Sequence, residues 1–320
     1  MRALVIDKTA ASPVVVRTDR AMAQPGKGES LIRVRVAGIC GTDLEQTRGY
    51  MDYSGVPGHE FVGEVVQSAS VGLLGKRVVG EINAACGQCE WCRAELGRHC
   101  PNRTVLGILG RDGAFADYLC LPDCNLTPLP DSLPDEVAVF TEPLAAGFEI
   151  FEQTHIEPGE RIAILGDGRL GAMVGLALTS RDLRPVIGGH HDNRMRLLAS
   201  LGLVAVQEHT LRPGYDVVVD CTGSAAGLAR CLELVRPRGR IILKSTVAAN
   251  DRINLAAIVV NEIQVLGSRC GRFAPALAAL ESGAFDPRPL ITDVFALDDA
   301  PAALQRAAEP SAFKVLLRVR

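Results

Sequence analysis

The chain has 320 residues, of which 48% are hydrophobic and 22% charged, and its formal net charge is −3. This composition is typical of a globular protein, and the length allows two ordinary domains. The small net charge, the lack of a Lys/Arg block and the aromatic content of 4% argue against a nucleic-acid partner. No apolar run approaches the roughly 20 residues that a membrane span requires, so we expect no membrane insertion.

The chain begins with a short apolar run at residues 1–6, which Asp7 and Lys8 interrupt. This run is too short for a secretory signal and is better interpreted as a first strand. We therefore expect the protein in the reducing cytoplasm. There, its ten cysteines are better explained by metal binding and burial than by disulfides.

Short β-like runs, separated by Gly, Pro and Asp, dominate the chain up to Pro130. Strands are predicted at residues 31–36, 61–66, 77–81 and 115–121. Helical periodicity is scarce in this part of the chain, so we expect a compact, mostly β domain.

After Pro130, strands and helices alternate. Helices are predicted at residues 135–152, 170–178, 193–201 and 225–235, and strands at residues 161–165, 185–188, 216–220 and 240–244. The alternation predicts an α/β fold with a parallel, doubly wound Rossmann sheet. A last helix at 274–282 and a strand at 314–319 are expected to close back onto the first domain. The predicted domains are residues 1–134 with 272–320, and residues 135–271.

Four cysteines lie close together in a polar loop that contains glycine, with the spacing C-x2-C-x2-C-x7-C. They are Cys86, Cys89, Cys92 and Cys100. Thiolates bind Zn²⁺ tetrahedrally, and two-residue gaps let consecutive sulfurs converge on one ion. Buried free thiols rarely cluster in this way, and an iron–sulfur cluster requires its own spacing. We predict a structural zinc, since four sulfurs leave no open coordination position.

A second group of possible metal ligands lies earlier in the chain. Cys40 begins the sequence Cys-Gly-Thr-Asp, and His59 and Glu60 follow on another predicted loop. Each residue alone is weak evidence, because a lone cysteine or histidine is usually an ordinary buried residue. Together they offer one sulfur, one imidazole nitrogen and one carboxylate. Three protein ligands with an open position are the arrangement that a catalytic zinc requires.

A glycine loop follows the predicted strand 161–165. Residues Gly166, Asp167, Gly168, Arg169, Leu170 and Gly171 form a GxGxxG sequence directly before an apolar helix. The placement between a strand and a helix is the context that makes this motif a dinucleotide site. Its glycines permit a tight turn and close approach of the pyrophosphate to the helix N-terminus.

Several segments occur in the order seen in zinc-containing medium-chain dehydrogenases. They are residues 40–43, Gly-His-Glu at 58–60, the four-cysteine loop, and Thr-Glu-Pro-Leu at 141–144. The chain resembles this superfamily over nearly its whole length, and within it the polyol, glucose and threonine dehydrogenase branch. The resemblance implies a GroES-like first domain and a zinc-dependent oxidoreductase. It would interconvert a small polar alcohol, polyol- or sugar-like, and its aldehyde or ketone with NAD(P), as a homodimer or homotetramer.

The resemblance also implies roles for individual residues. Cys40 and His59 would ligate the catalytic zinc with Glu60 as third ligand, and Glu142 would bind it directly or through its water. Asp43 would orient His59, a role compatible with capping a helix. Thr42 would hand the substrate proton toward solvent. Glu45 stands where many relatives have a histidine of this relay, and it either carries the proton, contacts the substrate or faces water.

The end of the second Rossmann strand bears on the choice between NAD and NADP. Gly189 stands where relatives carry the acidic residue that binds the ribose hydroxyl. Without that carboxylate, a 2′-phosphate is not repelled there, and His190, His191 and Arg194 can donate to it. We therefore predict a preference for NADP(H), with NAD(H) as the alternative if Asp192, later in the same loop, substitutes for the missing carboxylate.

Three further residues and two competing functions complete the sequence-based picture. By resemblance, Thr222, Ser268 and Arg269 line the nicotinamide side of the site. One competing function is a zinc-free quinone or enone reductase of the same superfamily, which the complete ligand set argues against. The other is a non-catalytic, nucleotide-sensing protein on this scaffold, which the presence of Thr42 beside the ligand set disfavours.

Overall fold

The computed structural model describes residues 1–8, 13–224, 226–245 and 255–319. The chain forms two compact units, Met1–Glu142 with Leu290–Arg320, and Pro143–Pro289. The sequence-based boundaries were residues 134 and 271, so the second unit begins and ends further along the chain than predicted. In the described part of the chain, no helix has the length and apolar character to cross a membrane.

The first unit is built on a seven-stranded sheet in the order β16-β17-β3-β4-β5-β9, with β8 also paired to β3. Its strands are β3 (Glu29–Gly38), β4 (Glu60–Gln67), β5 (Arg77–Gly80), β8 (Tyr118–Pro122), β9 (Leu126–Pro128), β16 (Ile291–Ala296) and β17 (Lys314–Arg318). Strand β17 lies antiparallel to β3, with Leu317 opposite Ala37. The predicted return of the C-terminal strand to the first domain is therefore confirmed. The helix predicted at residues 274–282 forms as α9 (Phe273–Glu281) but belongs to the second unit, so its assignment to the first domain was wrong.

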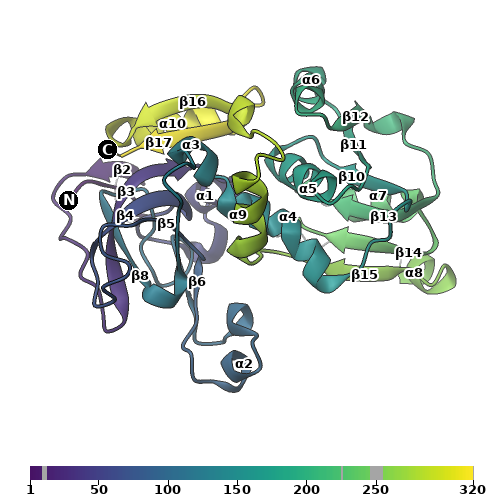
Figure 1. Cartoon of the computed structure of the whole chain (residues 1–320). Helices are drawn as coiled ribbons and strands as arrows, with labels where there is room; N and C mark the ends of the chain where they lie inside the picture. The colour runs from purple at the N-terminus through teal and green to yellow at the C-terminus, as the bar shows by residue number, and fades with distance from the viewer. Residues whose placement is uncertain (9–12, 225, 246–254, 320) are drawn as a thin grey trace. The chain divides into compact units, whose positions relative to one another are not determined.

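Shorter elements surround this sheet (Figure 1). They are β1 (Ala3–Ile6) paired with β2 (Val14–Arg17), α1 (Gly41–Thr47), α3 (Asp135–Ala138) and α10 (Ala300–Ala308). The central strand β3 buries Ile32 and Val34, whereas Arg33 and Arg35 alternate toward the other side. Arg35 and Arg77 each donate to the Asp135 carboxylate at 2.6 Å, which ties the start of α3 to the sheet.

The second unit contains six parallel strands in the order β12-β11-β10-β13-β14-β15 (Figure 1). They are β10 (Ile162–Leu165), β11 (Pro185–Gly189), β12 (Val204–Gln207), β13 (Tyr215–Asp220), β14 (Val235–Leu243) and β15 (Gln264–Gly267). The chain order of these strands reverses between β10 and β13, where doubly wound folds bind their ligands. The predicted Rossmann sheet is confirmed.

Six helices connect or flank these strands. They are α4 (Thr141–Gln153), α5 (Arg169–Thr179), α6 (Asp192–Ser200), α7 (Ala226–Leu234), α8 (Leu255–Val260) and α9 (Phe273–Glu281). The helix predicted from residue 225 begins at Ala226, and residue 225 itself lies outside the described residues. The helix α7 packs on β13 and β14 through buried residues such as Cys231, Val218 and Ile241.

The single helix predicted at residues 135–152 is wrong, because the chain forms two helices there. The helix α3 ends at Ala138 and α4 begins at Thr141, whose hydroxyl donates to the Ala138 carbonyl at 2.6 Å. Pro143 cannot donate a hydrogen bond and its ring would clash within a continuous helix. It is tolerated in the first turn of a new helix, where N–H groups have no intrahelical acceptor.

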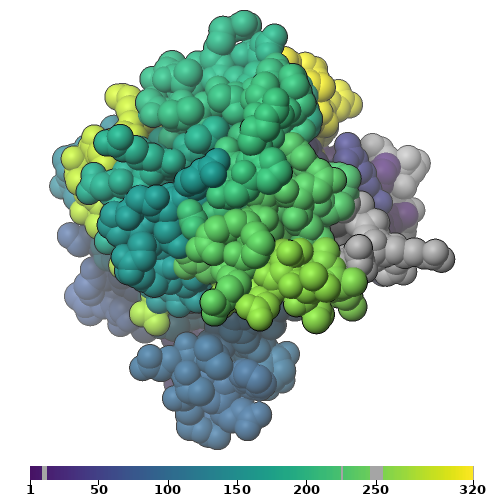
Figure 2. Space-filling model, turned by 90° about the vertical axis from the view of Figure 1, so that its right-hand side faces the viewer, coloured from purple at the N-terminus to yellow at the C-terminus, as the bar shows by residue number. Residues whose placement is uncertain are grey.

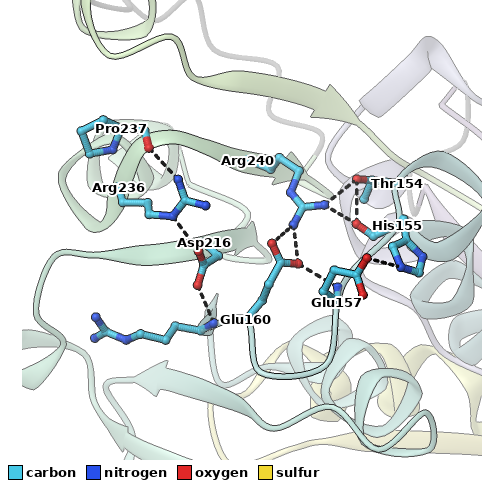
Figure 3. Close-up of polar contacts among 9 residues, drawn as sticks. Thr154, His155, Glu157, Glu160, Asp216, Arg236, Pro237 and Arg240 are labelled. Atoms are coloured by element: carbon cyan, nitrogen blue, oxygen red, sulfur yellow. Dashed lines mark hydrogen bonds and ion pairs between the residues drawn. The ribbon is translucent and has the colours of Figure 1, made fainter.

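An ion-pair network, made of the pairs Arg236–Asp216 and Arg240–Glu160, lies near the amino-terminal ends of β10 and β13 (Figure 3). The Asp216 carboxylate accepts hydrogen bonds from Nε of Arg236 at 2.6 Å and from the backbone N–H of Arg161 at 2.7 Å. Beside it, the Arg240 guanidinium binds both oxygens of Glu160. The network connects β13 and β14 with the loop that leads into β10, and so fixes the sheet on the side opposite to the glycine loop.

Candidate functional site

The four cysteines of the first unit form a closed cluster. They lie on a loop between β6 (Asn83–Ala84) and β7 (Thr104–Val105), which contains α2 (Glu90–Arg93). The loop projects from the rest of its unit (Figures 1 and 2). The Sγ–Sγ distances of four pairs are 3.4, 3.5, 3.7 and 3.9 Å. A tetrahedral ion with metal–sulfur bonds of about 2.3 Å would separate its sulfurs by about 3.8 Å, so the cluster fits Zn²⁺.

The pKa values of two thiols in this loop shift in opposite directions. Backbone N–H groups of Gln88 and Cys89, with the Cys100 thiol, lower the pKa of Cys86 to about 6, whereas burial and the neighbouring Cys89 and Cys100 thiols raise that of Cys92 to about 12. A thiolate is the form of cysteine that binds metal ions. None of the ten cysteines, all of them in the described part of the chain, forms a disulfide.

A second cluster gathers Cys40, His59 and Glu60, whose ligand atoms lie within 4.8 Å of one another. Cys40 is the N-cap residue of α1, and the other two residues precede or begin β4. Gly58 turns the chain into this position with a left-handed φ of 96°. On the neighbouring strand, a Cβ at Gly38 would lie 2.2 Å from Oε2 of Glu60, so a glycine there leaves room for the carboxylate.

Asp43 organises this second cluster. Its Oδ2 accepts the backbone N–H of Cys40 at 2.8 Å, and its Oδ1 accepts that of Gly58 at 3.1 Å. It therefore acts as the third helical residue that reaches back to the N-cap, rather than as the N-cap itself. Nδ1 of His59 lies 3.3 Å from Oδ1, which leaves Nε2 for a ligand. Burial lowers the pKa of His59, but the neighbouring Asp43 and Cys40 outweigh it and raise that pKa.

Lys314 was missed by the sequence analysis, although it lies against the same cluster. Its Nζ is 2.5 Å from Oε2 of Glu60, and the two residues are 3% and 1% exposed. The other oxygen of Glu60, Oε1, is buried and has no hydrogen-bond partner among the described residues. A buried carboxylate oxygen without a partner is costly, and a bound cation would satisfy it. The donor set therefore fits a zinc ion that keeps an open coordination position.

The remaining residues predicted for this site lie at different depths. Glu142, in the first turn of α4, is buried, and burial raises its pKa to about 7 although His59 opposes the shift. It is not among the three residues whose ligand atoms converge. Thr42 is half-buried, with Oγ1 3.9 Å from Sγ of Cys40. Glu45 is exposed and pairs with Arg48 at 2.7 Å.

The glycine loop of the second unit has the shape that its sequence predicts. Gly166 has a φ of 111°, and a Cβ there would lie 2.6 Å from the carbonyl oxygen of Cys221. A Cβ at Gly171 would lie only 1.9 Å from the carbonyl oxygen of Gly166. Gly168 is the N-cap of α5 and faces open space, while Arg169 and Leu170 form the first turn of the helix. A phosphate has room to approach the N-terminus of α5.

Other residues predicted to contact the dinucleotide lie at the carboxyl ends of the strands. Thr222 follows β13 and donates through its backbone N–H and its hydroxyl to the Asp220 carboxylate, at 2.9 and 2.8 Å. Lys244 follows β14 and donates to the Ser268 hydroxyl at 3.0 Å and to the Arg269 carbonyl at 2.8 Å. This buried lysine, which the sequence analysis did not consider, positions the loop after β15.

Comparisons with known proteins find relatives of both units. Residues 26–131 match the alcohol dehydrogenase GroES-like domain, and residues 171–282 match the zinc-binding dehydrogenase family. The chain is 30% identical to an L-threonine 3-dehydrogenase of Deinococcus deserti, over 99% of this chain and 98% of the relative. It is also 30% identical to a sorbitol dehydrogenase of Bacillus subtilis, over 88% and 87% of the two chains. A zinc-binding dehydrogenase from Sinorhizobium meliloti, solved with NADP, has a TM-score of 0.88, 26% identity and 99% coverage of both chains.

Proposed function

We propose that this chain, which belongs to the zinc-binding alcohol dehydrogenase family, transfers a hydride between a polar alcohol and NAD(P). The observation that carries the proposal is the convergence of Cys40, His59 and Glu60 on one point, with a buried carboxylate oxygen that lacks a partner. The same chain supplies a glycine loop before a helix in a doubly wound sheet. A polyol, a sugar or a hydroxy amino acid is the substrate class that the threonine and sorbitol dehydrogenase relatives suggest.

Two zinc ions would have separate roles. Cys40, His59 and Glu60 would hold the catalytic ion. Glu142, whose buried carboxyl group interacts electrostatically with His59 and Glu60, would take part through its carboxylate or a water. The structural ion would be held by the four cysteines of the projecting loop, Cys86, Cys89, Cys92 and Cys100. When bound, the catalytic zinc lowers the pKa of the substrate hydroxyl, and the nicotinamide accepts or gives the hydride.

The protein side chains would orient these groups and move the proton. Asp43, whose Oδ1 lies 3.3 Å from Nδ1 of His59, would orient that ring and leave Nε2 for the zinc. The Thr42 hydroxyl, next to Cys40, would accept the proton of the substrate and pass it outward. Glu45 lies one turn further along α1 and is exposed, so its carboxylate is the next acceptor toward solvent.

In the second unit, three groups of residues would bind the dinucleotide. The pyrophosphate would lie against Gly166, Gly168, Arg169, Leu170 and Gly171. Gly189, His190, His191 and Arg194 would surround the adenosine ribose. The nicotinamide would contact Thr222, Ser268 and Arg269, and Lys244 would hold the last two in place.

The test combines metal content with turnover. Purified protein should contain about two zinc ions per chain and reduce NAD⁺ or NADP⁺ with one or more members of a panel of polyols, sugars and hydroxy amino acids. Cys40→Ser should remove one ion and turnover together. Cys89→Ser is the matched control, since it should remove the other ion by disrupting the closed cluster. One zinc per chain with no turnover, or turnover that survives Cys40→Ser, would refute the catalytic-zinc assignment and favour the zinc-free or nucleotide-sensing functions.

The second unit also has a surface suited to self-association. Leu255, Val259 and Val260 of α8 are 64%, 74% and 79% exposed, and Val265 lies on the edge strand β15. This part of the unit is visible in Figure 2. In the described part of the chain, β15 has a neighbouring strand on one side alone. Such an edge beside exposed apolar side chains favours pairing with a second copy, as a homodimer or as half of a homotetramer. Light scattering should show that Val260→Lys lowers the oligomeric mass.

The thiol-rich zinc loop of the first unit bears on where the protein acts. Free thiols of this kind fit the reducing cytoplasm, so we propose that location.

A further inference from the structure

The glycine loop carries a buried carboxylate at the edge of the sheet where the dinucleotide site is proposed. Asp167 is the second residue of this loop and is 4% exposed. Its Oδ2 accepts hydrogen bonds from the backbone N–H groups of His190 at 2.9 Å and His191 at 2.8 Å. The ring Nδ1 of His191 lies 3.1 Å from both carboxylate oxygens, and Nη1 of Arg194 lies 3.8 Å from Oδ1. The side chains of His191 and Arg194 and the backbone N–H of His190, all assigned to the site of a 2′-phosphate, therefore already face Asp167.

Gly189 makes room for this carboxylate. A Cβ at position 189 would lie 2.5 Å from Cβ and from Oδ2 of Asp167, so a larger residue there would displace it. Dinucleotide-binding folds usually place the ribose-binding Asp or Glu at this end of the second strand. In this chain the strand ends in glycine, and the neighbouring loop after β10 supplies the carboxylate instead.

The other acidic residue of this region points elsewhere. Asp192 is exposed, and its Oδ1 accepts a hydrogen bond from Nε2 of Gln207 at 2.6 Å. Its carboxylate is thus directed toward the end of β12. Among the described residues at the end of β11, Asp167 is the buried acidic side chain.

The charge of Asp167 is stable at neutral pH. Burial raises the pKa of Asp167, but hydrogen bonds from His191 and His190 outweigh burial and hold it below the usual range of an aspartate. An ionised carboxylate in a place nearly closed to water acts strongly on a neighbouring charge, because solvent screens it little.

We propose that Asp167 is the ribose-binding carboxylate of this enzyme and that it makes the chain prefer NAD(H) to NADP(H). Ribose hydroxyls can donate to a carboxylate, whereas a 2′-phosphate is repelled by it. The backbone N–H groups of His190 and His191, which would otherwise hold the phosphate, are already bonded to Asp167. The NADP(H) preference predicted from the sequence depended on the absence of a carboxylate at position 189. The inference rests on the proposed dehydrogenase function and specifies its cofactor.

The test is a binding measurement that does not need turnover. Isothermal titration calorimetry would compare NADH with NADPH, and 5′-AMP with 2′,5′-ADP, on the full-length, zinc-loaded protein. The wild type should bind the member of each pair that lacks the 2′-phosphate more tightly, by on the order of 100-fold. This factor follows from Coulomb repulsion between the Asp167 carboxylate and a 2′-phosphate roughly 6 Å away at an effective dielectric constant of about 20. Asp167→Asn should lower this ratio at least tenfold, whereas the matched control Asp192→Asn should leave it unchanged.

The outcomes separate this inference from the proposed function. Equal or tighter binding of NADPH and 2′,5′-ADP to the wild type would overturn the inference without any variant. A ratio that Asp167→Asn does not change, or that Asp192→Asn changes as much, would overturn the role of Asp167. If none of the four compounds binds, the dehydrogenase function itself is refuted, and the inference falls with it.

Discussion

Replacing Lys314 by methionine tests how the charges at the candidate catalytic site are balanced. Lys314 and Glu60 form an ion pair that is almost fully buried, between β17 at the end of the chain and β4. Lys314→Met keeps most of the side-chain volume and removes the ammonium group. In the metal-free protein it leaves the Glu60 carboxylate buried with neither of its oxygens paired, since Oε1 has no hydrogen-bond partner among the described residues.

Breaking a buried ion pair by removing one partner costs about 3–5 kcal/mol. For a unit of this size, each kcal/mol corresponds to a shift of about 2–4 °C in the unfolding temperature. We therefore expect Lys314→Met to lower the unfolding temperature of the metal-free first unit by roughly 10 °C. With zinc bound, Glu60 would again face a cation, so the loss should be clearly smaller.

Differential scanning calorimetry of chelated and zinc-loaded protein would measure both effects on the unfolding transition that Lys314→Met shifts. The double variant Glu60→Gln with Lys314→Met removes both charges and should be more stable than Lys314→Met alone. Lys76→Met is the matched control, because Lys76 is an exposed lysine of the same unit. A loss below about 1 kcal/mol for metal-free Lys314→Met, or a double variant no more stable than the single one, would refute this account of the site.

Three further predictions concern other parts of the chain. Cys100→Ser should remove one zinc per chain and shift the fluorescence of Trp91, the single tryptophan, which lies on α2 within the cysteine loop. Gly171→Ala should weaken NADH binding at least about tenfold in calorimetry, because its Cβ would lie 1.9 Å from the Gly166 carbonyl oxygen and must move the glycine loop. Burial raises the pKa of Asp216, but the two hydrogen bonds of Figure 3 outweigh burial and lower that pKa. The ionised Asp216 carboxylate therefore stabilises the folded state above pH about 3.9, the pKa of an aspartate in the unfolded chain, and this stabilisation is lost as the pH falls. Urea unfolding should show that Asp216→Asn lowers the free energy of unfolding by about 1 kcal/mol at pH 7, and that this loss becomes smaller below about pH 4. A loss that grows in acid would contradict the lowered pKa of Asp216.

The features that the sequence predicts correctly are local in the chain. The glycine loop lies between a strand and a helix that are both short and contiguous, and the four cysteines fall in one loop. Spacing alone is informative in such cases, because a few backbone turns bring the residues together. The break between α3 and α4 was missed although its cause, Pro143, is also local, because the apolar periodicity of residues 135–152 suggested one continuous helix.

Lys314 could not be predicted in this way. Its partner Glu60 lies 254 positions earlier in the chain, and the contact exists because β17 pairs with β3, which in turn pairs with β4. The one sequence signal was a lysine directly before three apolar residues at the start of the strand. A buried charge of this kind implies a buried partner, but the identity of that partner depends on the strand order, which periodicity does not provide.

Asp167 shows a different limit of sequence analysis. The motif that contains it was recognised in the sequence, but the residues that lie next to it in space were not predicted. Parallel strands end at the same edge of a sheet, and Leu165 at the end of β10 pairs with Gly188 near the end of β11. The residue that follows one strand therefore lies beside the residues that follow the other. A carboxylate needed at that edge can come from either loop, so its absence from one loop does not establish its absence from the site. The choice of cofactor in such folds depends on the charges that all the loops of this edge bring together, and a sequence argument has to consider each of them.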